Sequence, residues 1–163
     1  MPALATLLIA AALGLPEVLA NAAQARTPAL RFAPKGYLIE LKATEEAGQT
    51  ELTWTYFDGE SDPERDFFVD STVREGPPVV RLNREPKREK KPTALDLPAV
   101  AVVWGKLSPP AGEAFSKWEG FRLRPRVDGV PCWRTRLKDG GPIYFDARTG
   151  EKSDACGEPW KNK

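Results

Sequence analysis

Short runs with the pattern of β-strands recur along the chain after residue 35. In Thr50–Phe57, the large residues Leu52, Trp54 and Tyr56 alternate with threonines. This period of two is typical of strands, as are the Gly, Pro and Asp residues that bound each run. We predict strands over Gly36–Thr44, Thr50–Phe57, Phe67–Val73, Val79–Leu82, Leu97–Leu107, Phe121–Val127, Pro131–Leu137 and Pro142–Asp146.

Helical patterning is sparse by comparison, and only Glu113–Trp118 suits a helix, which would be short. The pattern therefore predicts a single, mainly β domain over 26–163, as an antiparallel sandwich or a curled sheet with one short helix. An α+β arrangement is the alternative. Arg84–Lys91 has five cations, two anions and no apolar residue. We interpret it as an exposed loop and a candidate linker over 84–92 between two halves.

The first 25 residues have the pattern of a secretory signal. An apolar stretch over Ala3–Leu15 precedes the small-x-small triplet of residues 23–25, which is typical of a cleavage site. A cut three residues earlier, after Ala22, fits almost as well. The apolar stretch is shorter than the roughly 20 residues that a membrane-spanning helix needs. We predict a signal peptide over 1–25, a periplasmic or secreted protein, and a mature chain without a transmembrane segment. An N-terminal membrane-associated helix that stays attached is the alternative.

The cysteine content fits an exported protein. Cys132 and Cys156 are the only cysteines, and an oxidising compartment favours joining them. The closed loop of about 25 residues would stabilise the fold by about 3 kcal/mol. Two cysteines without a histidine cannot complete a tetrahedral zinc site.

The composition excludes several classes of function. The chain has no histidine, which removes Ser–His–Asp and Cys–His nucleophiles and imidazole bases. Its 24 basic residues nearly balance 23 acidic ones, so specific nucleic-acid binding is not expected. Phosphate-binding and dinucleotide motifs are missing from the sequence, and no cofactor is predicted. An enzyme would have to use carboxylates alone, as a glycan-cleaving enzyme can.

The register of the last three strands predicts a basic face. A three-residue loop over 128–130, which suits a glycine-containing turn, separates apolar from charged positions cleanly. One face would then carry Phe121, Leu123, Val127, Trp133 and Leu137. The other would carry Arg122, Arg124, Arg126, Arg134, Arg136 and Lys138.

A second odd-length loop would place Tyr144 opposite Arg136 and Asp146 opposite Arg134. Six cations on neighbouring strands repel one another unless they are neutralised. Arginine suits bidentate contacts with carboxylate or phosphate, and Tyr144 adds a stacking surface. The alternative is a solvated outer face with no partner.

These features favour an exported, non-enzymatic binding protein. Its partner would be another exported protein with an acidic surface, or an anionic glycan or lipid surface. An inhibitor or immunity-type protein that fills a partner's acidic cleft is a variant of this function. The carboxylate-dependent, glycan-acting enzyme is the alternative from another class.

A second charged segment is acidic and includes Asp58, Glu60 and Asp62. Hard cations such as calcium bind several oxygens from a flexible loop. The EF-hand pattern fails here, because Pro63 stands where its glycine belongs and Val69 where its bidentate Glu belongs. We expect a solvated hairpin loop and no metal, with calcium as the weaker alternative.

Ala111–Lys152 has the predicted order helix, strand, strand, strand and ends in Tyr144-Phe-Asp-Ala-Arg-Thr-Gly-Glu151. This order and this last turn resemble the C-terminal part of a PepSY-like unit. Such units are small exported modules associated with inhibition or regulation of other proteins. The resemblance covers about a quarter of the chain and implies no particular functional residue.

Overall fold

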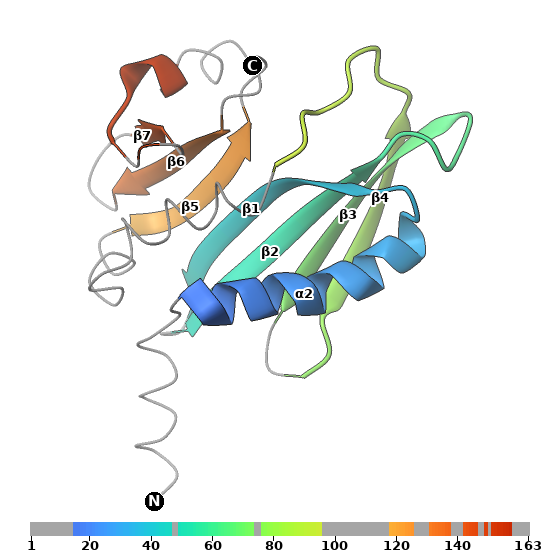
Figure 1. The fold of residues 1–163 in the computed structure, drawn as a ribbon, viewed down its shortest axis with the longest axis horizontal. Coiled ribbons are helices and arrows are strands. Elements are labelled where there is room, and N and C mark those ends of the chain that lie inside the picture. The colour runs from blue at the N-terminus through green and yellow to red at the C-terminus, as the bar shows by residue number, and fades with distance from the viewer. Residues whose placement is uncertain are drawn as a thin grey trace, which may run out of the picture.

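The protein is mainly β, as predicted, and its strands form one antiparallel sheet (Figure 1). The computed structural model describes residues 15–46, 49–73, 76–95, 118–125, 131–137, 142–146, 149 and 151–157. The sheet has seven strands in the order β4-β3-β2-β1-β5-β6-β7. All strands of the described ranges belong to this sheet, so the curled sheet, rather than the sandwich, describes the fold.

The strand pattern in the sequence located these elements within a few residues. The strands are β1 (Tyr37–Glu46), β2 (Gln49–Asp58), β3 (Arg65–Val73), β4 (Val79–Pro86), β5 (Trp118–Pro125), β6 (Pro131–Leu137) and β7 (Pro142–Asp146). The expected strand over Leu97–Leu107 lies outside the described residues. The expected short helix also lies outside them, except for Trp118, which begins β5.

The first four strands form a simple antiparallel meander, and β5 returns beside β1. Leu41 of β1 lies opposite Leu123 of β5, and both side chains are fully buried. A change of register between Leu38 and Glu40 of β1 marks a β-bulge. Because β1 pairs with both β2 and β5, the two parts of the chain share one sheet.

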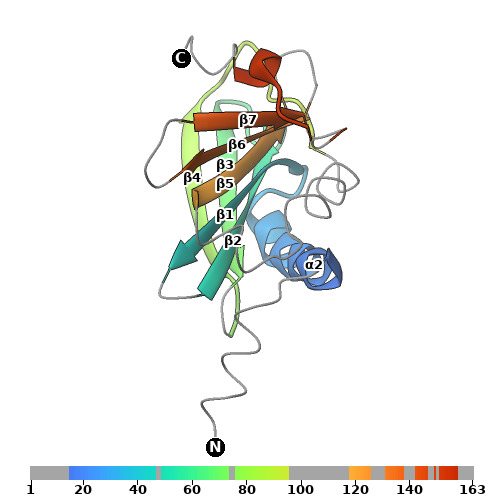
Figure 2. The same cartoon turned by 90° about the vertical axis from the view of Figure 1, so that its left-hand side faces the viewer.

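Helix α2 (Leu15–Phe32) covers one face of the meander (Figures 1 and 2). Small side chains on the helix allow its backbone to lie close to the strands. They share one hydrophobic core with the large residues Trp54, Leu41 and Leu52 of the sheet. The buried positions of α2 and the residue after it are Val18, Ala22, Ala25, Ala29 and Ala33.

Helix α2 was not expected from the sequence. It is 18 residues long and extends across the predicted cleavage positions after Ala22 and Ala25. An Ala-rich stretch has the same composition in a signal peptide and in a helix that packs closely, so composition alone does not separate the two. No helix among the described residues is long and apolar enough to cross a membrane.

The two faces of β5 and β6 separate as predicted. Leu123 lies opposite Trp133, so these apolar residues share one face. Arg122 lies opposite Arg134, on the other face. A two-residue loop would have paired an odd with an even position and mixed the faces.

The exact register differs by two residues from the predicted one. Tyr144 lies opposite Arg134 rather than Arg136, and Asp146 lies opposite Cys132 rather than Arg134. The ladder between β5 and β6 ends at a pair of prolines, which have no N–H group to continue it. Separation of the faces fixes only whether the shift is odd or even, so the pattern could not choose between registers two residues apart.

The charged segment differs in part from the expected loop. Strand β4 continues to Pro86, with Arg84 opposite Phe67 and Glu85 opposite Asp66. The guanidinium of Arg84 lies 5.7 Å from the centre of the Phe67 ring. The beginning of the segment is therefore part of the sheet.

Candidate functional site

The face of the sheet that points away from α2 carries a row of polar residues across six strands. Strand alternation identifies it, because Trp54 points to the helix and its neighbours in β2, Thr53 and Thr55, point away. We call this surface the open face. Its central row, in register from β3 to β7, is Thr72, Thr53, Lys42, Arg122, Arg134 and Tyr144.

Three cations lie side by side in this row. Lys42 is exposed, and Arg122 and Arg134 are half-buried. The Arg122 Nε atom forms an ion pair with Oε1 of Glu40 on the neighbouring strand. The Arg122 side chain is 39% exposed and that of Glu40 is 19% exposed, so water screens the pair only in part. Glu40 thereby offsets one of the three positive charges.

Hydroxyl groups extend the open face toward β3. Oγ1 of Thr53 and Oγ1 of Thr72 lie 2.8 Å apart and share a hydrogen bond. In the next row, the hydroxyl of Thr55 donates to Oδ1 of Asp70 at 2.6 Å. Asp70 lies opposite Arg81 of β4. Cross-strand hydrogen bonds of this kind hold the side chains in place, so this part of the surface is ordered before any partner binds.

The structure brings together Arg122, Arg134 and Tyr144 among the predicted binding residues. Arg124 lies opposite Cys132 and Arg136 opposite Pro142, at register positions that alternation assigns to the open face. The predicted binding residues Arg126 and Lys138 lie outside the described residues. Sequence reasoning missed Lys42 and Glu40, because pairing between β1 and β5 cannot be inferred from either strand alone.

The predicted disulfide lies at one end of the open face. Cys132 and Cys156 are joined, with their Cα atoms 5.8 Å apart. Both residues are buried, and Cys156 belongs to the short helix η1 (Asp154–Gly157). The segment before η1 runs along the edge of β7, where Ser153 N–H donates to the carbonyl oxygen of Tyr144 at 2.9 Å. The disulfide therefore joins η1 to β6, the strand next to this edge.

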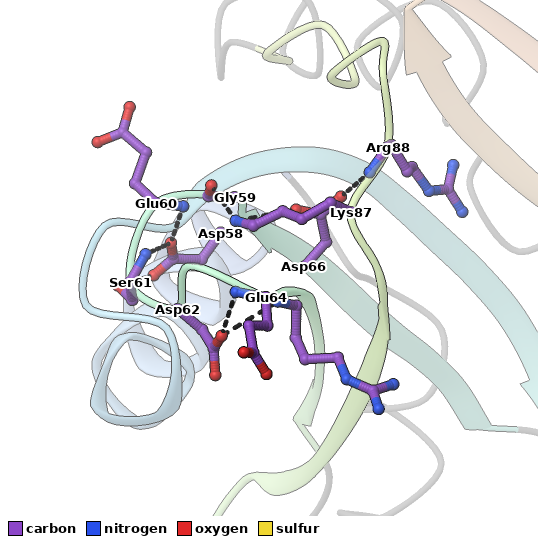
Figure 3. Close-up of polar contacts among 10 residues, drawn as sticks. Asp58, Gly59, Glu60, Ser61, Asp62, Glu64, Asp66, Lys87 and Arg88 are labelled. Carbon is purple, nitrogen blue, oxygen red and sulfur yellow. Dashed lines mark hydrogen bonds and ion pairs between the residues drawn. The ribbon is translucent and has the colours of Figure 1, made fainter.

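The acidic segment forms a compact turn around Asp58 (Figure 3). The carboxylate of Asp58 is 1% exposed. It accepts backbone hydrogen bonds from Lys35, Glu60 and Ser61, each at 2.9 Å. It also accepts a hydrogen bond from the Ser61 hydroxyl at 2.5 Å. Burial raises the pKa of Asp58, but these four hydrogen bonds together outweigh it and leave the pKa below its usual value.

These contacts give the calcium candidates a structural role. The oxygens of Asp58 already serve the turn, and Oδ1 of Asp62 accepts hydrogen bonds from the N–H groups of Glu64 and Arg65. Glu60 lies 4.0 Å from the ammonium group of Lys35. Within the ranges that the structure describes, no group of three or more His, Cys, Asp or Glu residues could hold a metal ion.

A second buried carboxylate connects this turn to the charged segment (Figure 3). Asp66 is 1% exposed. Its carboxylate lies 3.5 Å from Lys87 Nζ and accepts a hydrogen bond from Arg88 N–H at 2.8 Å. Lys87 also donates to the carbonyl oxygen of Gly59 at 2.6 Å. Lys87 and Arg88 are thus docked on the turn, and no local sequence pattern indicates this contact.

Comparison with known proteins assigns no function to this site. No protein-family model and no curated protein matches the sequence. Among solved structures, the fold is similar to that of a candidate lipoprotein from Clostridium difficile 630. The two chains are 9% identical, the match covers 74% of this chain and 82% of the other, and the TM-score is 0.42.

Proposed function

We propose that this protein is an exported, non-enzymatic interaction protein that binds an acidic surface of another exported protein through its open face. The observation that carries the proposal is the row of Lys42, Arg122 and Arg134 on three neighbouring strands. Neighbouring strands lie about 4.8 Å apart, so these cations form a short basic strip of fixed spacing. Such a strip can bind carboxylates of a partner, because each arginine can donate two parallel hydrogen bonds to one carboxylate.

The mixture of groups on the open face favours a protein partner over a lipid or glycan surface. Glu40 and Asp70 lie among the cations, and Thr53 and Thr72 form an ordered pair of hydroxyl groups. A surface that only attracts anions would gain nothing from these carboxylates. Charges of both signs in a fixed pattern instead fit a partner with a complementary pattern, because like charges then exclude the wrong partners.

An inhibitor or immunity-type role is the form of this function that we favour. The resemblance to PepSY-like units supports it, since those modules inhibit or regulate other proteins. The glycan-acting alternative gains no support from the two buried carboxylates. Asp58 and Asp66 both accept backbone hydrogen bonds within the fold.

Crosslinking capture from the exported fraction tests the proposal. The double substitution Arg122→Gln/Arg134→Gln removes two cations from the open face. The matched control, Lys90→Gln/Lys91→Gln, removes two exposed cations from the charged segment. We expect one dominant protein with the wild type and the control, and none with the open-face variant. Capture of the same protein by all three, or retention only on anionic vesicles or glycans, would contradict the proposal.

A further inference from the structure

We propose that helix α2 stays in the folded protein. If the N-terminus is processed, the first residue of the mature chain is then Val18 or an earlier residue, and no cut occurs after Ala22 or Ala25. The inference rests on how α2 packs against the sheet. It is independent of what the open face binds.

The buried positions of α2 lie on both sides of the predicted cuts. Val18, Ala22 and Ala25 are 0%, 4% and 0% exposed, and Ala29 and Ala33 are both fully buried. Their spacing of three or four residues places them on a single face of a helix. All of them belong to the same hydrophobic core as the sheet residues. The part of α2 that a signal peptidase would remove therefore packs like the part that would remain.

The opposite side of α2 is exposed, as in an amphipathic surface helix. Ala23, Gln24, Arg26 and Thr27 are all exposed to solvent. The division of α2 into a buried and an exposed side fits a permanent place on the sheet.

A specific hydrogen bond also ties the N-terminal half of α2 to the sheet. The indole N–H of Trp54 donates to Oδ1 of Asn21 at 2.7 Å. Trp54 is fully buried at the centre of the core. Removal of Asn21 would leave a buried indole N–H without this acceptor, which is costly in a protein interior.

A cut after Ala25 would also leave too little helix to remain in place. Only residues 26–32 of α2 would be left, and isolated helices of that length are not stable in water. The lost residues include three of the five small apolar ones that share the hydrophobic core with Trp54. The cut would thus uncover the core at its largest side chain.

The N-terminus of the native protein tests this directly. The full chain is expressed in an exporting bacterial host, purified from the exported fraction or, failing export, from the whole cell, and its intact mass is measured. We expect the first residue at or before Val18. A first residue at any later position would overturn the proposal.

A pair of matched substitutions tests the packing in the same full-length protein. Asn21→Ala removes the acceptor for Trp54, and Gln24→Ala changes an exposed residue of the same helix. We expect Asn21→Ala to lower the urea midpoint and to shift the tryptophan emission to longer wavelength, and Gln24→Ala to leave both unchanged. If Asn21→Ala behaves like Gln24→Ala, α2 does not cover Trp54 and the proposal fails.

Discussion

Arg122 of β5 lies directly opposite Arg134 of β6, and it forms an ion pair with Glu40 of β1 on its other side. Two like charges at facing positions destabilise a sheet unless a third group offsets them. Glu40 supplies that third group within the fold. Lys42, in the same row, is exposed to solvent, where a carboxylate of a partner can reach it.

Replacing Glu40 with Gln tests this balance of charges. We expect the free energy of unfolding to fall by about 1 kcal/mol or less at low salt, because Arg122 then faces Arg134 without its acceptor. Screening by added salt weakens this repulsion, so the deficit should shrink at high salt. Urea unfolding at two ionic strengths measures it, with the exposed Glu89→Gln as the control. An equal deficit at both ionic strengths would show that repulsion is not the cause.

The carboxylate of Asp58 should make stability depend on pH in the acid range. Its pKa is lower in the folded protein than in the unfolded chain. Its contribution is therefore complete above the ordinary aspartate pKa near 4 and is lost as the pH falls through the lower, folded value.

We expect Asp58→Asn to lower the free energy of unfolding by about 2 kcal/mol at pH 7, since an amide accepts these hydrogen bonds less strongly. The variant should also lose less stability than the wild type on acidification. Thermal unfolding at pH 7 and at pH 2 to 3 measures both effects, and Glu64→Gln, which changes an exposed carboxylate of the same segment, is the control. A variant whose stability falls with pH as steeply as that of the wild type would rule out this role.

Lys87 should contribute to stability although it lies in a segment that the sequence presents as a linker. Its ammonium group contacts both the buried Asp66 and the carbonyl oxygen of Gly59. We expect Lys87→Met to lower the free energy of unfolding by about 1–2 kcal/mol, because Asp66 loses its cation. Chemical denaturation compares it with Lys90→Met in the exposed part of the segment. Equal stabilities of the two variants would mean that the contacts of Lys87 do not contribute to the free energy of unfolding.

The disulfide should contribute more to the free energy of unfolding than any single contact at the β7 edge. Opening it releases a loop of about 25 residues, worth about 3 kcal/mol in the unfolded chain. We expect the double substitution Cys132→Ala/Cys156→Ala to lower the urea midpoint strongly. A reducing agent should lower the midpoint of the wild type and leave that of the variant unchanged. If the reducing agent leaves the urea midpoint of the wild type unchanged, the disulfide does not stabilise the fold.

The strands could be predicted because their signal is local. Alternation in Thr50–Phe57 and the glycine and proline boundaries place β2, β6 and β7 nearly to the residue. The separation of Leu123 from Arg122 also follows from alternation. What the pattern could not decide is a register shift of two residues, because such a shift leaves every side chain on the same face.

The rest could not be predicted, because it depends on contacts between distant residues. Asp66 and Lys87 meet across a turn, and Lys42 comes beside Arg122 only because β5 pairs with β1. Helix α2 could not be predicted from its composition. Its alanines fit a signal peptide, and Pro28 within it is unfavourable for a helix, so its place over Trp54 became clear only from the packed sheet.

The salt dependence of binding to the captured partner tests the central claim most directly. Affinity is measured at several ionic strengths for the wild type, for Arg122→Gln/Arg134→Gln and for Lys90→Gln/Lys91→Gln. If the open face meets an acidic surface, wild-type binding weakens with salt, the open-face variant binds at least tenfold more weakly with a shallower dependence, and the control matches the wild type. An open-face variant that binds with wild-type affinity and the same salt dependence would contradict this account.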